Sequence, residues 1–359
     1  MHLLNAIADT VQRHAALMRE RRRRGEAGAV DFAYHMMAEA ADHTAQPRCG
    51  RFELGDDVLT AARGVAASRG SSILQALHLA RLPHPVTWLE CLAPLEFVGS
   101  HQFSRLGWLL LEDGDQGFVG HPYALHPHRG PIWLKHSIGL FYGEPQPLDY
   151  DGELLAQSRA LKREITEADE ADRLRLYRNG LRASGYHVPD EETLRRSLRE
   201  YLARPPEENV ATTMLYQRVQ VEVHDDVGRP VQVPVGSPEL TAYRAQAMAL
   251  VAMLLLVNSR NAVVVDDEPD LERLNRARQR KGNVPLRPLR PVTLDLSRRL
   301  RAARRAGDNA DAHFLRAHLV RGHFKTRATG VFWWSAHPRG NVGRAAAQNY
   351  EVVGVPDGA

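Results

Sequence analysis

Cysteine is scarce in this chain of 359 residues. Its two cysteines, Cys49 and Cys91, can form neither a disulfide framework nor a zinc site built from cysteine ligands. Two thiols are typical of a protein in a reducing compartment, so we expect a cytoplasmic location. The chain is long enough to bury a core without disulfides or metals to hold it together.

Long apolar runs are also absent. The longest run, residues 247–257, has eleven residues, whereas a helix needs about 20 to span a bilayer. The first 24 residues form an amphipathic pattern that ends in four arginines, whereas a signal peptide begins with its basic residues. We therefore expect no secretion signal and no membrane partner.

Lysine occurs four times, so 43 of the 47 basic residues are arginine. Arginine richness alone indicates little, because a GC-rich coding sequence also produces it. The distribution of charge is more informative: residues 271–350 contain 18 Lys and Arg against 4 Asp and Glu, although the whole chain carries only +4. A segment with a net charge of +14 needs a polyanion or an acidic surface to lie against.

Common nucleotide and hydrolase motifs are missing, including G-x-x-x-x-G-K-[ST], G-x-G-x-x-G and G-x-S-x-G, so we predict no cofactor. Histidines gather at 121–136 and 313–337, but without the spacing H-E-x-x-H or a carboxylate at a natural ligand position. Acidic residues at 266–270 could hold magnesium, but a solvated acidic loop is favoured. We therefore predict no metal site.

The hydrophobic pattern predicts an α+β fold with N-terminal helices, an antiparallel sheet, a helical middle region and a small basic C-terminal sheet unit. Helical periodicity covers 1–24, 32–41 and 56–82, the last broken near Gly70. Residues 83–143 instead contain about four short strands rich in β-branched and aromatic residues. The predicted regions are an α+β domain (1–148), a mainly helical region (149–270) and a basic C-terminal region (271–359).

Several elements of the second half can be predicted from local signals. Ser237-Pro238 begins a helix that is apolar nearly all round as far as about Val257, which is typical of a core helix. The other elements that we expect there are a charged helical stretch over 149–186, a helix capped by Asp190 that stops before Pro205, a hairpin of 219–223 with 231–235, a buried strand at 262–265, a proline-rich linker at 285–291 and a very basic helix at 297–306.

The most distinctive segment, residues 313–340, combines histidines, basic residues and two adjacent tryptophans. It predicts strands at about 316–325 and 331–337, joined by a turn containing Thr329-Gly330, with a third strand at 350–353. Side chains alternate along a strand, so pairing Lys325 with Val331 would bring one set of them to a common surface. That set is Arg321, His323, Lys325, Trp333 and His337. A slip of one residue would present Phe332 and Trp334 instead.

Such a surface is suited to nucleic acid, either RNA or DNA. Basic side chains would contact phosphate, and whichever of the two tryptophans faces outward would stack on a base. The residues predicted to bind are Arg298, Arg301, Arg304, Arg316, Arg321, Lys325, Arg327, Trp333, Trp334 and Arg339.

Two alternatives stay open on the residues alone. In a metal-independent ribonuclease, His323 and His337 would act as general acid and base on a ribose 2′-hydroxyl and the leaving oxygen. Arg321 and Lys325 would stabilise the charge on the phosphorus oxygens. In a structural or adaptor protein, the basic region would instead dock on an acidic protein partner.

Two segments resemble a pattern found in uncharacterised proteins of bacteriophages, prophages and bacterial mobile elements. One consists of RGHFK (321–325), FWW (332–334) and HPRG (337–340), and the other of LARLPHP (79–85) followed by WLE (88–90). The resemblance implies a mobile-element setting. It implies no activity and transfers no catalytic residue.

Overall fold

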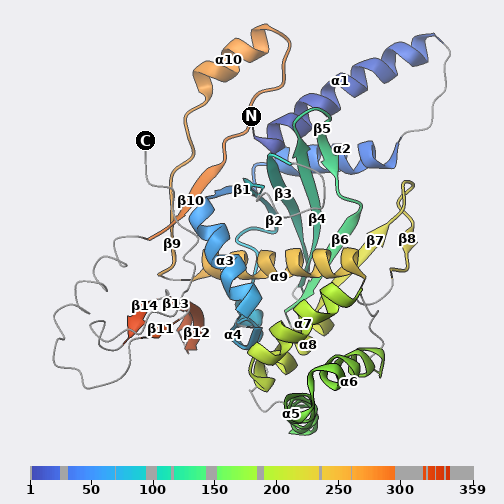
Figure 1. The fold of residues 1–359 in the computed structure, drawn as a ribbon. Coiled ribbons are helices and arrows are strands. Elements are labelled where there is room, and N and C mark those ends of the chain that lie inside the picture. Colours follow the sequence, from blue (N-terminus) through green and yellow to red (C-terminus); the bar gives the residue numbers. More distant parts are fainter. Residues whose placement is uncertain are drawn as a thin grey trace, which may run out of the picture.

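A sheet of ten strands runs through the molecule and is covered by helices on both faces (Figure 1). The structure is a computed structural model. It describes residues 2–24, 31–68, 70–93, 103–114, 117–142, 152–183, 190–233, 237–259, 261–295, 318–320, 322–327, 329–334 and 337–339. The arrangement of N-terminal helices, sheet and C-terminal hairpin confirms the predicted α+β class.

The helices are α1 (Leu3–Arg23), α2 (Phe32–Ala45), α3 (Asp56–Ser68), α4 (Gly70–Ala76), α5 (Gly152–Glu167), α6 (Glu170–Ala183), α7 (Glu191–Ala203), α8 (Pro206–Arg218), α9 (Pro238–Asn258) and α10 (Glu272–Arg280). A short 3-10 turn, η1, covers Leu77–Leu79. The strands are β1 (Cys49–Leu54), β2 (Val86–Leu92), β3 (Arg105–Asp113), β4 (Gly117–His126), β5 (Gly130–Trp133), β6 (His136–Phe141), β7 (Val219–His224), β8 (Pro230–Val231), β9 (Val263–Val265), β10 (Arg290–Leu294), β11 (His318–Val320), β12 (His323–Arg327), β13 (Gly330–Trp334) and β14 (His337–Arg339).

The order of the sheet is β8-β7-β6-β4-β3-β2-β1-β10-β9, with β5 paired to the end of β4. β1 runs parallel to β2 and β10, and the other neighbours run antiparallel. The antiparallel strands β2 to β6 confirm the sheet expected over 83–143. This one sheet takes strands from all three predicted regions, so the boundaries at 148 and 270 do not separate independent sheets.

Alternation along the strands divides the core into two layers. On β2, Trp88 joins the layer beneath α1 and α2, whereas Leu89 and Cys91 join the layer beneath α3, α4, α8 and α9. Both faces of the central strands are covered, which explains why these strands read as nearly continuous apolar runs. Beyond α8, the charged helices α5 and α6 lie farther from the sheet (Figure 1).

Helix α9 confirms the core helix expected from the apolar run. The hydroxyl of Ser237 accepts a hydrogen bond from the Leu240 amide at 3.2 Å and so caps the first turn. Residues 240–258 are long and apolar enough to cross a membrane by length and composition alone. However, 67% of that stretch is buried inside the protein, as expected for the core helix of a globular domain.

Two expectations for the second half of the chain are wrong. The strand at 262–265 is not buried: β9 is an edge strand with one partner, so Val264 and Val265 stay exposed. Residues 285–291 are not a linker, because β10 begins at Arg290 and lies between β1 and β9. Two asparagine side chains hold the proline-rich segment in place. The backbone N–H of Leu286 donates to the side-chain oxygen of Asn275, and that of Arg287 donates to the side-chain oxygen of Asn5.

A buried carboxylate fastens α1 to the sheet. Glu90, fully buried on β2, accepts hydrogen bonds from the amides of Leu3 (2.7 Å) and Leu4 (3.1 Å) at the start of α1. It also accepts from the Trp88 indole (3.1 Å) and from Arg105 (2.9 Å). Burial alone would raise the pKa of Glu90, but the hydrogen bond from His2 and those from the amides of Leu3 and Leu4 outweigh it and hold the pKa below its ordinary value. Glu90 is therefore ionised and caps the helix.

Candidate nucleic-acid interface

The predicted C-terminal hairpin exists, but its register differs from the one expected. β12 and β13 pair Phe324 with Trp333 and Lys325 with Phe332, so the pairing of Lys325 with Val331 is wrong by one residue. The reason lies at the turn, because Gly330 already belongs to β13 and pairs with Arg327. At a φ of 124°, Gly330 adopts a backbone conformation that a residue with a side chain rarely takes. Every side chain of β13 therefore faces the opposite way.

The inner face of the hairpin is part of the protein core. Phe324, Val331 and Trp333 are only 3%, 2% and 8% exposed and join the layer formed by α4 and α9. The rings of Phe324 and Trp333 lie 5.1 Å apart. Trp333 therefore cannot stack on a base, and its assignment to the binding surface is wrong. A large aromatic side chain here stabilises the docking of the hairpin on the body.

Asn261 adds a polar attachment to this apolar contact. Its amide nitrogen donates to the Trp333 carbonyl and its amide oxygen accepts from the Trp333 N–H, both at 2.9 Å. One side chain thus satisfies both backbone groups of Trp333, as a neighbouring strand would.

Replacing Asn261 with alanine is expected to loosen the hairpin by about 1–3 kcal/mol, because it leaves two backbone groups of Trp333 without partners. Hydrogen exchange of the Trp333 amide measures this directly, and the rate should rise roughly 5- to 150-fold. Asn258→Ala is the matched control, since the Asn258 amide donates to carbonyls of residues 79 and 81 instead. Equal acceleration in both variants would contradict a specific role for Asn261.

The outer face of the hairpin carries aromatic rings beside cations. We call this face the outer hairpin surface; its members are His323, Lys325, Arg327, Phe332 and Trp334. Trp334 is 41% exposed, and the Lys325 ammonium lies 4.8 Å from its ring centroid. The Arg327 guanidinium lies 5.5 Å from the centroid of Phe332, and His323 lies 5.9 Å from Trp334.

The cations of this surface are not neutralised by the described part of the protein. Among the described residues, no carboxylate forms an ion pair with Lys325 or Arg327. By contrast, Arg278 and Arg290, also in the basic region, pair with Asp9 and Glu268. The outer hairpin surface therefore combines an exposed indole with positive charge. Phe332 was not among the residues predicted to bind, although its two-residue spacing from Trp334 is the signal that places both rings together.

The remaining predicted residues lie on β14 or outside the described residues. His337 lies on β14, which pairs with β11 in a two-stranded sheet separate from that of β12 and β13. Arg339 pairs with His318. The predicted residues Arg298, Arg301, Arg304, Arg316 and Arg321 lie outside the described residues, as do the helix expected at 297–306 and the strand expected at 350–353.

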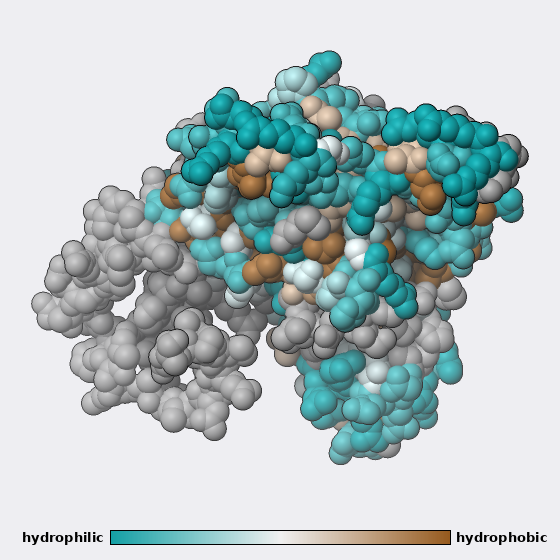
Figure 2. Space-filling model, turned by 90° about the horizontal axis from the view of Figure 1, so that it is seen from above, coloured by the Kyte–Doolittle hydropathy of each residue, from teal (hydrophilic) through white to brown (hydrophobic). Residues whose placement is uncertain are grey.

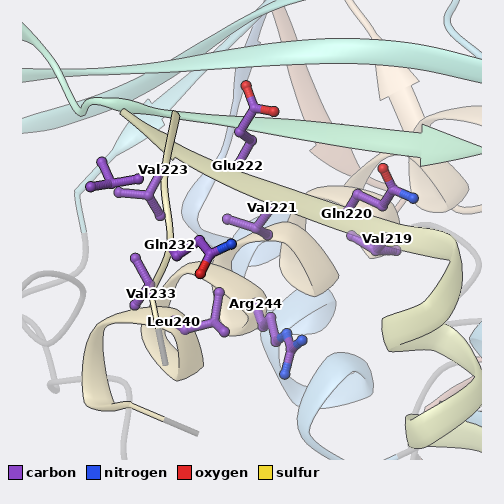
Figure 3. Close-up of a pocket in the computed structure, with 10 residues that line it drawn as sticks. Val219, Gln220, Val221, Glu222, Val223, Gln232, Val233, Leu240 and Arg244 are labelled. Atoms are coloured by element: carbon purple, nitrogen blue, oxygen red, sulfur yellow. The ribbon is translucent and has the colours of Figure 1, made fainter. Parts of the chain in front are cut away.

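A hollow of about 380 Å³ lies where β7 and β8 meet the first turns of α9 (Figure 3). Alternation turns Val219 and Val221 toward α9, whereas Glu222 lies on the other side of β7 (Figure 3). The charged groups of Glu222 and Arg244 therefore do not converge in it.

A wider hollow between α6 and α7 is lined by leucines and by arginines and glutamates that include the Arg195–Glu191 pair. Neither hollow has the arrangement of a catalytic site.

No group of three or more metal-ligating side chains exists among the described residues, including the described histidines of 121–136. A comparison of the chain with protein-family models, with curated proteins and with solved structures finds no match. The resemblance to proteins of phages and mobile elements therefore stays a prediction.

Proposed function

We propose that this protein binds single-stranded nucleic acid through the outer hairpin surface. The observation that supports the proposal is the exposed ring of Trp334, with the Lys325 ammonium 4.8 Å from its centroid. An exposed indole offers a stacking platform to any base, and the neighbouring cation attracts phosphate. The two groups that such binding needs are thus side by side.

The spacing of the two outer rings, the half-buried Phe332 and the exposed Trp334, favours a flexible single strand. Phe332 and Trp334 lie two residues apart on β13, which is about 7 Å. Bases in a duplex are stacked on one another and cannot reach such rings, whereas unpaired bases can be spread over them. The adjacent Lys325 and Arg327 would then follow the sugar–phosphate backbone.

The geometry favours binding over cleavage. A ribonuclease of the predicted kind needs two imidazoles close to one phosphate, but His323 on β12 and His337 on β14 belong to two separate two-stranded sheets. The aromatic rings also favour nucleic acid over an acidic protein, because carboxylates gain nothing from an exposed ring, whereas bases do.

Replacing Trp334 with alanine is expected to weaken the binding of a fluorescent single-stranded oligonucleotide by about 1–3 kcal/mol, or roughly 5- to 150-fold. Lys325→Gln with Arg327→Gln should reduce the slope of log affinity against log salt by about 1.4, since each phosphate contact contributes about 0.7 on single strands. Fluorescence anisotropy over a range of salt concentrations measures both effects.

Phe141→Ala is the matched control for Trp334, because Phe141 is an aromatic side chain of nearly equal exposure (40%) on β6. It should leave affinity unchanged. If the unaltered chain binds no oligonucleotide at low salt, or if both variants lose affinity equally, the proposed function is wrong. Preferential binding of polyglutamate would support the acidic-partner alternative instead.

A further inference from the structure

Helix α10 and the end of α1 form the top of the molecule, away from the hairpin (Figure 1). Seen from above, this end is covered by hydrophilic side chains with isolated apolar ones between them (Figure 2). None of the nine residues of α10, all of them described, is buried. A helix this short does not persist by its own propensity, so other contacts must hold it.

Several side chains hold α10 in place. Asn275 donates to the Leu286 carbonyl (2.9 Å) and accepts from the Leu286 amide (2.6 Å). Arg278 donates to both carboxylate oxygens of Asp9 on α1 (2.7 and 2.9 Å) and to the Val284 carbonyl (2.8 Å). The fold thus positions a helix that contributes nothing to the core. Its exposed face is therefore the feature that needs an explanation.

That exposed face is a stripe of arginines. At 3.6 residues per turn, Arg273, Arg276 and Arg280 share the side of α10 opposite the two anchors, Asn275 and Arg278. The stripe is about 10 Å long, since seven residues separate its ends. Among the described residues, Arg273 and Arg280 form no ion pair, and Arg276 meets Glu272 only at 3.5 Å, on an exposed helix surface. Such an exposed pair neutralises little charge.

Helix α1 adds two more exposed arginines at this end of the molecule. Asp9 and Gln12 face α10, since Gln12 donates to the Gly282 carbonyl at 3.0 Å. The side of α1 that carries Gln12 continues with Arg19 and Arg23, which follow Gln12 by seven and eleven residues, close to two and three whole turns. Both side chains are exposed. We call Arg273, Arg276, Arg280, Arg19 and Arg23 the arginine rim.

We infer that the arginine rim binds the sugar–phosphate backbone of nucleic acid without reading the bases. A duplex carries about one negative charge per 1.7 Å of its axis, so a stripe of this length meets several phosphates. A protein partner would need an apolar centre to bury, but the described exposed residues of α10 offer one large apolar side chain, Leu274. The arginine rim and the outer hairpin surface would both bind nucleic acid, but through different residues.

The test is the full chain with the triple change R273Q/R276Q/R280Q, titrated with a DNA duplex over a range of salt concentrations. The slope of log affinity against log salt should fall by about 2.7, since each lost contact contributes about 0.9. The matched control is R175Q/R178Q/R182Q, which removes three arginines at the same spacing from α6. Circular dichroism should show unchanged helix content in both variants.

An unchanged slope in the α10 variant, or an equal change in the α6 control, would overturn the inference. So would a loss of binding to phosphatidylserine vesicles with duplex binding intact, because the rim would then recognise a lipid surface. A lowered duplex slope in the α10 variant, with single-strand binding unaffected by Trp334→Ala, would support the rim and refute the hairpin proposal. An unchanged duplex slope in the α10 variant, together with weaker single-strand binding in Trp334→Ala, would refute the rim alone.

Discussion

Replacing Glu90 with alanine is expected to lower the free energy of unfolding by about 3–5 kcal/mol, the usual cost of breaking a buried ion pair by removing one partner. The change leaves the amides of Leu3 and Leu4 and the Trp88 indole without their acceptor, in a layer closed to water. It also removes the carboxylate that offsets the positive end of α1. Urea denaturation should show a lower midpoint with an unchanged slope.

The control for Glu90 is Glu53→Gln. Glu53 also accepts from Arg105 at 2.9 Å but is partly exposed, so its loss leaves Arg105 paired with Glu90 and should cost about 1 kcal/mol or less. Glu90→Gln, which keeps the size of the side chain, should fall between the two. Equal effects of Glu90→Ala and Glu53→Gln would contradict the capping role.

The pH dependence of stability provides a second readout for Glu90. Its pKa is lowered in the folded protein, so its contribution is complete above the ordinary glutamate value of 4.5 and disappears as the pH falls through the lower folded value. The Glu90→Ala variant should therefore lose less stability than the unaltered protein over that acidic range.

Replacing Trp333 with alanine is expected to cost about 3–5 kcal/mol, as for other buried tryptophans. The indole fills the space between the hairpin and the layer beneath α4 and α9, and its removal leaves a cavity beside Phe324. Trp334→Ala, the adjacent change, should alter stability by about 0.5 kcal/mol or less, because that ring is exposed.

Thermal unfolding of the two tryptophan variants, followed by circular dichroism, measures this contrast. Phe324→Leu is the control for volume: it retains an apolar side chain at the same contact and should cost less than Trp333→Ala. A larger loss of stability in Trp334→Ala than in Trp333→Ala would contradict the observed register.

Elements with a strong periodic pattern or a clear start signal were predictable from the sequence. Examples are α9, with its cap at Ser237, and the β7–β8 hairpin around the turn that contains Gly228 at a φ of 81°. β1 and β10 were not predicted, because charged residues in β1 and a proline in β10 interrupt the apolar pattern that is typical of a strand. Arg51 and Glu53 look like solvent-facing residues but pair with Glu268 and Arg105, and Pro291 lies within β10. Such pairing depends on distant residues, which local patterns do not contain.

All residues of the outer hairpin surface except Phe332 could be named from the sequence, but the register that brings them together could not. Two adjacent tryptophans satisfy either register equally well, because one faces inward in each case. Two contacts fix the register of β12 with β13. Arg327 pairs with Gly330, and Asn261, more than 70 residues earlier in the chain, forms hydrogen bonds with the backbone of Trp333. Neither the turn position nor this long-range hydrogen bond leaves a signal in the hairpin sequence.

The position of β1 between β2 and β10 also affects how the nascent chain folds. β2 follows β1 soon after it leaves the ribosome, but β10 begins only at Arg290 and is therefore synthesised much later. Until then, one edge of β1 has no partner strand and can pair with another unfinished chain. The charged side chains Arg51 and Glu53 on β1 reduce that danger, because extended segments that carry charge add poorly to one another.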